Sequence, residues 1–207
     1  RRWLKRRHLR DVMAAERFIE LIDGDTIQRR VAELGEQITN DYPSEDVVVV
    51  CILKGSLLFM KDLMDHLPLT YTPEFISLTR FGREGRVAVA LDVSVPLDDR
   101  DVLIVLDIVD TGLTLNTIRT MIDAHGARSV RTAALLDKVP RRIIDVDVEY
   151  RGFEVGDEYL LGYGLDHEGL YRNLDSVWAV MDMADFSEDP LQFVPIAFSQ
   201  SGSLQGQ

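Results

Sequence analysis

The sequence reads VLIVLDIVDTGLT from Val102 to Thr114, and two patterns meet inside this stretch. Its first part is β-branched and almost wholly apolar, which predicts a strand buried on both faces of a parallel sheet. The apolar period then changes, because Leu115, Ile118, Met121 and Ile122 fall on one helical face and Gly126 provides a stop. The chain is therefore predicted to run from a strand through a tight turn into the N-terminus of a helix.

The turn of this unit has the chemistry of a phosphate site. A helix N-terminus presents free backbone N–H groups and the positive end of the helix dipole, and both favour an anion. Gly112 lets the backbone approach a ligand closely, while Thr111 and Thr114 add hydroxyl donors. Asp107 and Asp110 place two carboxylates beside the same turn.

Two further segments repeat the strand–turn pattern. Val47–Leu53 is an apolar run followed at once by Lys54, Gly55 and a helical pattern, and Val130–Leu136 is predicted to be a further buried strand, which ends in Asp137-Lys138. Repeated apolar strands with intervening helices predict an α/β fold with a doubly wound, mostly parallel sheet. Ligands of such sheets collect at the carboxyl ends of the strands, where Lys54, the stretch 107–114 and Lys138 all fall.

Composition and charge limit the possible functions. The net charge of −12 argues against a nucleic-acid binder that works through bulk electrostatics, and no apolar run is long enough to span a bilayer. Cys51 is the single cysteine and lies in an apolar strand, so it is expected to be a small core residue in a reducing, cytoplasmic setting. Dinucleotide and P-loop readings are weak, because neither glycine motif occurs.

The chain is expected to divide into three parts. Residues 1–20 form a basic N-terminal arm, residues 21–185 form the main domain, and residues 186–207 form a C-terminal tail that is partly disordered. The first ten residues contain six Lys or Arg and no acid. Because the chain starts at arginine and not at methionine, it is expected to be part of a longer gene product.

The order of residues in the central stretch resembles the phosphoribosyl-diphosphate (PRPP) signature of type I phosphoribosyltransferases. That signature has two acids, two apolar residues and then Asp-Thr-Gly-x-Thr. The chain looks most like the hypoxanthine-guanine branch, and the similarity runs from about Ile22 to Met181. One position departs from the pattern, because Leu106 stands where the family usually has the first acid.

The resemblance implies the type I phosphoribosyltransferase fold, with a small hood built from the terminal segments and an antiparallel lid hairpin. It implies a purine salvage enzyme that transfers 5-phosphoribosyl from PRPP to N9 of a 6-oxopurine, hypoxanthine or guanine, giving IMP or GMP and diphosphate. Mg²⁺ is the implied cofactor, and a homodimer or homotetramer is the implied assembly.

Roles follow from matching positions. Asp110 matches the general base, and Asp107 and Asp166 match carboxylates that meet the metal. Lys138 matches the lysine that donates to the purine 6-oxo group, which favours oxopurines over adenine. The positions that match PRPP contacts are Lys54, Gly55, Asp107, Asp110, Thr111, Gly112, Leu113, Thr114 and Arg172, and those that match purine contacts are Lys138, Tyr159, Leu160 and Asp166.

The lid and the first turn also have family counterparts. Two strands, Phe75–Arg80 and Val87–Val93, are predicted to form an antiparallel hairpin, in which Arg80 and Phe81 occupy the place of the family's Ser-Tyr. This lid is shorter than usual, and lids of this kind exclude water from the reacting centre. In relatives the Lys-Gly peptide of the first turn, here Lys54-Gly55, is often cis.

Three alternatives remain open at this stage. One is a regulator with the phosphoribosyltransferase fold that binds RNA, which the basic arm favours and the acidic body opposes. Another is a PRPP- or nucleotide-binding protein that has lost turnover through Leu106 and the short lid. The third is an enzyme for a different base, such as xanthine. If the missing acid orients the ribose, PRPP binding or turnover should be weaker, and Leu106→Glu should improve kcat/KM.

Overall fold

The computed structural model describes residues 17–42, 46–81 and 86–198. These residues form two compact units: a large one built from one continuous segment, Asp25–Asp157, and a small one that combines residues 17–24 with residues 158–198. This division differs from the boundaries expected at residues 20 and 185. Residues 17–24 and 158–198 both contribute strands to the sheet of the small unit.

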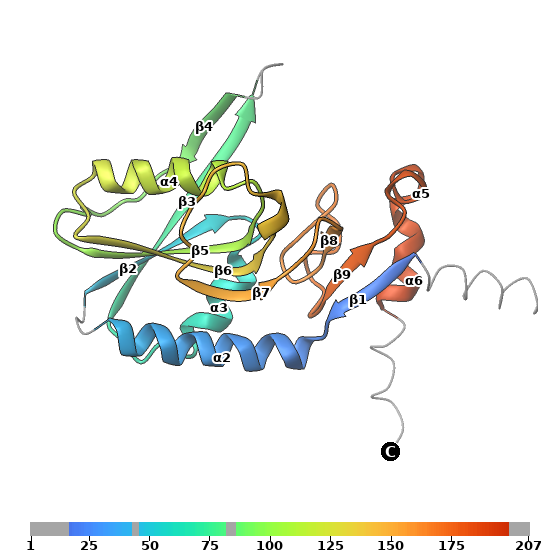
Figure 1. Ribbon diagram of the computed structural model, residues 1–207, viewed down its shortest axis with the longest axis horizontal. Helices are drawn as coiled ribbons and strands as arrows, with labels where there is room; N and C mark the ends of the chain where they lie inside the picture. The colour runs from blue at the N-terminus through green and yellow to red at the C-terminus, as the bar shows by residue number, and fades with distance from the viewer. Residues whose placement is uncertain (1–16, 43–45, 82–85, 199–207) are drawn as a thin grey trace, which may run out of the picture. The chain divides into compact units, whose positions relative to one another are not determined.

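The large unit is built on a six-stranded sheet of order β4-β3-β2-β5-β6-β7 (Figure 1). The strands are β2 (Val47–Leu53), β3 (Tyr71–Phe81), β4 (Arg86–Leu91), β5 (Asp101–Val109), β6 (Ser129–Asp137) and β7 (Tyr150–Glu154). All neighbouring pairs are parallel except β3 with β4. The predicted doubly wound, mostly parallel sheet is therefore confirmed, and β5 lies at its centre.

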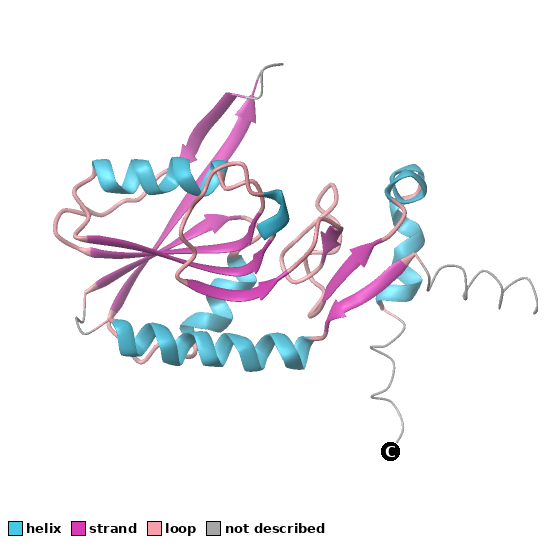
Figure 2. Ribbon diagram, viewed as in Figure 1, coloured by secondary structure: helices cyan, strands magenta, loops and turns pink. Residues whose placement is uncertain are grey.

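Helices cover both faces of this sheet, with α4 (Leu113–Ala124) on one side and α2 (Gly24–Asp41) and α3 (Leu57–Met64) on the other (Figure 2). α2 buries Ile27, Val31, Leu34 and Ile38, which recur at helical spacing. α4 buries the predicted Leu115, Ile118 and Ile122, whereas Met121 is only partly buried. Leu106 belongs to the apolar cluster that the buried α4 residues share with β2 and β5. Successive strand residues point to opposite faces, so Asp107 faces away from that cluster.

Cys51 lies fully buried in β2, as expected for a small core residue. Burial, together with the negative charge of Asp107, raises the pKa of its thiol to about 12. The group therefore stays protonated at neutral pH and is a poor nucleophile.

The lid hairpin is present as β3 and β4, with Phe81 paired to Arg86 at its end. Residues 82–85 and the side chains of Arg80 and Phe81 lie outside the described part of the structure. The predicted antiparallel excursion is thus confirmed for the backbone, and the lid roles of Arg80 and Phe81 stay predictions.

The small unit has a three-stranded antiparallel sheet of order β1-β9-β8. Its strands are β1 (Phe18–Ile22), β8 (Tyr159–Leu161) and β9 (Val177–Val180), followed by α5 (Met183–Glu188), the 3₁₀ helix η2 (Pro190–Phe193) and α6 (Val194–Ala197). Phe18 stacks on Phe193 at 4.4 Å between ring centroids, and Phe186 meets Phe18 edge to face at 5.7 Å. These aromatic rings give the small unit a core of its own.

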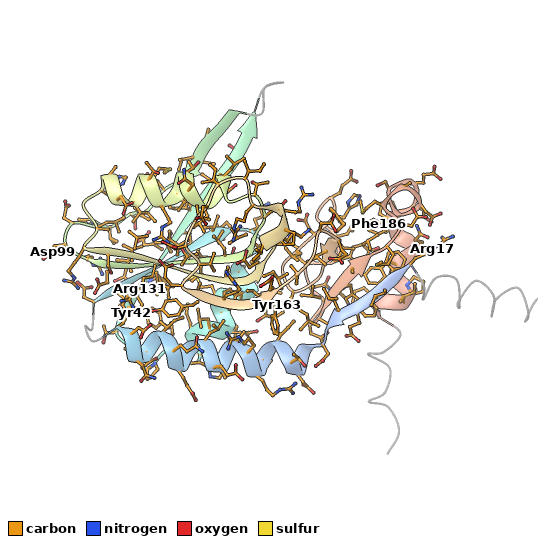
Figure 3. The ribbon with its side chains drawn as sticks, viewed as in Figure 1. Arg17, Tyr42, Asp99, Arg131, Tyr163 and Phe186 are labelled. Carbon is orange, nitrogen blue, oxygen red and sulfur yellow. The ribbon has the colours of Figure 1, made fainter. Side chains whose placement is uncertain are left out.

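Contacts at both ends of the chain extend the ordered structure beyond the expected limits. Arg17, which Figure 3 labels near Phe186, forms an ion pair with Asp185 at 2.5 Å. Phe186 and Phe193 are fully buried, so residues 186–198 are folded and not a disordered tail. The remaining parts of the expected arm, residues 1–16, and of the expected tail, residues 199–207, fall outside the described residues, so the predictions for them stay predictions.

A polar cluster of Tyr42, Arg131 and Tyr150 lies at the amino-terminal edge of the large sheet. The guanidinium of Arg131 lies 5.0 Å from the ring centroid of Tyr42, and its Nη1 donates to the Tyr150 hydroxyl at 2.9 Å (Figure 3). Burial is the main cause that raises the pKa of both phenols, for Tyr150 to about 12.

Across the described residues, every helix is too short or too polar to cross a membrane.

Candidate active site

Three neighbouring strand ends bring the predicted residues of the large unit to one edge of the sheet. β2 ends at Leu53 before Lys54, β5 ends at Val109 before Asp110, and β6 ends at Asp137 before Lys138. Since β5 pairs in parallel with both β2 and β6, the carboxyl ends of all three strands meet at this edge. The predicted convergence of Lys54, Asp110 and Lys138 is confirmed at the level of the sheet.

The turn after β2 packs directly on Asp107. The Ser56 hydroxyl donates to Asp107 Oδ1 at 3.3 Å and accepts from the Asp107 backbone N–H at 2.9 Å. A Cβ atom on Gly55 would lie only 1.6 Å from Asp107 Oδ2, so this position has no room for a side chain. A cis peptide is present in this turn, but it joins Leu53 to Lys54, one bond before the expected Lys54–Gly55.

The turn after β5 has the shape predicted for a phosphate loop. Gly112 is the N-cap of α4 with φ of 84°, a left-handed conformation that favours glycine. A Cβ atom there would also lie 2.5 Å from the carbonyl oxygen of Ile144. The backbone N–H groups of Ile143 and Ile144 both donate to the Thr111 carbonyl, at 3.0 and 3.1 Å, and fix the turn from outside.

The helix that follows this turn is open to an anion at its first turn. Within α4 the first turn contains no acidic residue, and Leu113 and Thr114 are exposed. The Leu113 N–H makes a long contact of 3.5 Å to the Thr111 hydroxyl. Backbone N–H groups and two threonine hydroxyls are thus gathered where a phosphate would bind.

Asp110, the predicted general base, has two arginine neighbours that the sequence did not reveal. Arg141 Nε donates to Asp110 Oδ1 at 2.6 Å, and Arg142 Nη1 donates to the Asp110 backbone carbonyl at 2.9 Å. The Arg141–Asp110 pair is nearly half exposed on both sides. An exposed pair of this kind is worth about 0–1 kcal/mol, so it can open readily for a substrate.

Lys138 is held beside this base by the backbone. Its N–H donates to the carbonyl of Val109 at 2.9 Å, the residue directly before Asp110. Its side chain is largely buried, with 8% of the residue exposed. The preceding residue, Asp137, is fully buried and forms ion pairs with Arg142 and, at 2.6 Å, with Arg151.

Four predicted site residues belong to the small unit: Tyr159, Leu160, Asp166 and Arg172. The Tyr159 hydroxyl donates to the Asp166 carbonyl at 3.1 Å and lies 3.1 Å from His167 Nδ1. Burial, then the negative charges of Asp166 and Glu168, raise the pKa of Tyr159, so its phenol stays neutral at physiological pH. Leu160 is buried in β8.

Asp166 and Arg172 are paired with each other within one loop of the small unit. Arg172 Nη2 contacts Asp166 Oδ1 at 2.7 Å, and its Nη1 donates to the Gly164 carbonyl at 2.5 Å. The second carboxylate oxygen of Asp166 accepts from the Gly169 N–H at 2.6 Å. The predicted metal ligand and the predicted diphosphate cation are therefore already paired in this loop.

The predicted metal ligands suit Mg²⁺ in type, although they do not make a complete protein site. No group of three or more His, Cys, Asp or Glu that could hold a metal occurs among residues 17–42, 46–81 and 86–198. Mg²⁺ is commonly held by one or two carboxylates together with waters and substrate phosphates. Asp107 belongs to the large unit and Asp166 to the small one, and each is a carboxylate of the kind that a substrate-bound Mg²⁺ takes as a protein ligand.

Comparisons with known proteins agree with this geometry. The phosphoribosyl transferase domain family matches residues 20–168. A hypoxanthine-guanine phosphoribosyltransferase of Streptococcus thermophilus is 35% identical over 161 residues, which cover 76% of this chain and 89% of that protein. One of Staphylococcus aureus is 38% identical over 158 residues, covering 74% and 88%. A crystal structure of a Bacillus anthracis hypoxanthine-guanine phosphoribosyltransferase superposes with a TM-score of 0.75 at 37% identity, covering 78% of this chain and 98% of that one.

Proposed function

Because this chain belongs to the phosphoribosyltransferase family, we propose that it is a purine salvage enzyme. It transfers 5-phosphoribosyl from PRPP to N9 of hypoxanthine or guanine and releases diphosphate. The observation that carries this proposal is the meeting of Lys54, Asp110 and Lys138 at three adjacent strand ends. The named relatives of Streptococcus, Staphylococcus and Bacillus support the choice of base.

The predicted site residues of the large unit have the following chemical roles in this reaction. The N–H groups at the start of α4 and the hydroxyls of Thr111 and Thr114 hold the 5′-phosphate. Lys54 binds the departing diphosphate, and Lys138 donates to the purine 6-oxo group. As the bond from N9 to C1′ forms and the bond from C1′ to diphosphate breaks, Asp110 accepts the proton of the purine imidazole ring.

The remaining roles rest on the matched positions. Tyr159 stacks on the purine, and the backbone carbonyl of Leu160 meets its edge. Arg172 contacts diphosphate, while Asp107 and Asp166 offer oxygens to Mg²⁺, with Asp107 also facing the ribose hydroxyls. Bound Mg²⁺ supplies charge neutralisation for the diphosphate leaving group. The enzyme is proposed to act in the cytoplasm as a homodimer or homotetramer, which light scattering would test.

The experiment is turnover of hypoxanthine, guanine, xanthine and adenine with PRPP and Mg²⁺, followed by ultraviolet absorbance. Asp110→Asn runs beside the native protein, and Asp123→Asn serves as a matched control because that carboxylate is exposed at the far end of α4. We expect an oxopurine to be consumed, and D110N to lower kcat by about 10²–10⁴-fold, the range that general bases contribute.

Other results would contradict the proposal in different ways. Turnover of adenine, or of xanthine alone, would leave the family intact and refute the choice of base. Binding of PRPP to the native protein without turnover of any base would refute the enzyme and favour a binding protein. Equal activity of D110N and D123N would remove Asp110 from its role as base.

A further inference from the structure

The segment that follows Lys138 returns against the phosphate turn and joins two parts of the site. Val139–Arg141 forms a short 3₁₀ helix, and the next residue, Arg142, has only 15% of its side chain exposed. Its Nη1 donates to the backbone carbonyl of Asp110 at 2.9 Å. Its Nη2 donates to the carboxylate of Asp137, which is fully buried directly before Lys138.

One planar guanidinium therefore spans the ends of two strands. Asp110 follows β5 and Asp137 ends β6, and the two strands pair in parallel up to Val109 and Asp137, while the Lys138 N–H also donates to the Val109 carbonyl. A guanidinium holds its donors in a rigid fork, so two bonds from one group fix both distance and direction. The chain offers the buried carboxylate of Asp137 as the anchor of that fork.

We propose that Arg142 is a positioning residue of the transfer reaction. Strand pairing ends at Val109 and Asp137, and Arg142 extends this frame to the next residue of β5's turn. It thereby fixes Asp110, which takes the purine proton, relative to Lys138, which binds the purine 6-oxo group. This inference rests on the proposed function. Loss of the Arg142 guanidinium would let Asp110 shift relative to Lys138, and a displacement of about 1 Å can cost about 100-fold in rate.

Arg151 provides a matched control on the same carboxylate. Its Nε contacts Asp137 Oδ2 at 2.6 Å from β7, and its Nη1 faces Glu154. Removing either arginine weakens the compensation of the buried Asp137 charge, so both changes should lower Tm. Only the change at position 142 also breaks the bond to Asp110.

The experiment compares the native enzyme with Arg142→Lys, Arg142→Met and Arg151→Met. Lysine keeps the charge beside Asp137 but has a single ammonium in place of the fork. We expect both Arg142 variants to lower kcat by about 10–100-fold and to raise KM for the oxopurine severalfold, with a smaller change in KM for PRPP. Arg151→Met should keep kcat and both KM values within about twofold of native.

The purine KM separates positioning from stability. Partial unfolding lowers the active fraction, and hence the apparent kcat, but leaves KM unchanged. The positioning role is refuted if R142K retains the native purine KM and kcat. It is also refuted if R151M shows the same changes in kcat and in both KM values as the Arg142 variants. In either case the proposed function stands. If the native protein turns over no oxopurine, the proposed function fails and this role fails with it.

Discussion

Gly55→Ala is expected to destabilise the protein because the added Cβ atom would clash with the carboxylate of Asp107. The new Cβ would lie 1.6 Å from Asp107 Oδ2 and 2.7 Å from its Cγ, so the carboxylate has to rotate away. Rotation would break the bonds that Asp107 Oδ1 accepts from the Ser56 hydroxyl at 3.3 Å and from the Ile108 N–H at 2.9 Å. A hydrogen bond to a charged group contributes about 1.5–3 kcal/mol, so the clash should cost at least that amount.

A double-mutant cycle isolates this contact. Urea unfolding is measured for the native protein, Gly55→Ala, Asp107→Ala and the double variant. Replacing glycine by alanine also lowers the entropy of the unfolded chain, by about 0.4–1 kcal/mol, but this contribution cancels between the two backgrounds. We expect a coupling free energy of about 1.5–3 kcal/mol, with Gly55→Ala nearly neutral once Asp107 is alanine. A coupling below about 0.5 kcal/mol would refute the reasoning.

Two further predictions concern a buried strand residue and a buried phenol. Leu106→Glu should raise kcat/KM for PRPP by restoring the first acid of the motif, and an unchanged or lower kcat/KM in a steady-state assay would contradict this prediction. The same change should lower the free energy of unfolding by about 1–3 kcal/mol, because Leu106 lies in the apolar cluster shared by α4, β2 and β5. Tyr150 is protonated up to a pKa of about 12 in the folded protein but only to 10.0 when unfolded, so stability should fall between pH 10 and 12. In Tyr150→Phe this fall, followed by urea unfolding at each pH, should be about 2 kcal/mol smaller, and equal pH slopes would count against it.

The large sheet was predictable because its strands obey local rules. The mainly apolar stretches Val47–Leu53, Val102–Val109 and Val130–Leu136 match β2, β5 and β6. The helical spacing in α4 identified its buried residues, except that Met121 is only partly buried. The turn residues Gly112 and Gly126 have positive φ, as their positions after a strand and after a helix indicate.

The elements that escaped prediction depend on distant partners. β1 reads as the end of a basic arm until β9 pairs with it, and Phe186 reads as part of a tail until Phe18 packs against it. β7, Tyr150–Glu154, contains a glycine and three polar or charged side chains, so it has no apolar run.

The site shows the same limit. The residues that matched the motif could be named, but Arg141 and Arg142 become site residues only because their loop folds back onto Asp110. An arginine pair after a proline has no local feature that separates it from a solvated surface pair. The steric role of Gly55 likewise depends on Asp107 arriving from another strand.

The composite origin of the small unit has a consequence for how the protein is made. Phe18 of β1 pairs with Val180 of β9, so β1 leaves the ribosome well before the strand that it pairs with. At synthesis rates of about 5–20 residues per second this delay is on the order of ten seconds, and the continuous segment of the large unit emerges and can fold during it. Pairings between such distant segments are slow to form. We therefore expect nascent chains that stop before residue 177 to bury the large sheet but to leave β1 without its neighbour, so that the segment carrying Tyr159 and Asp166 acquires its final form only after β9 has been made.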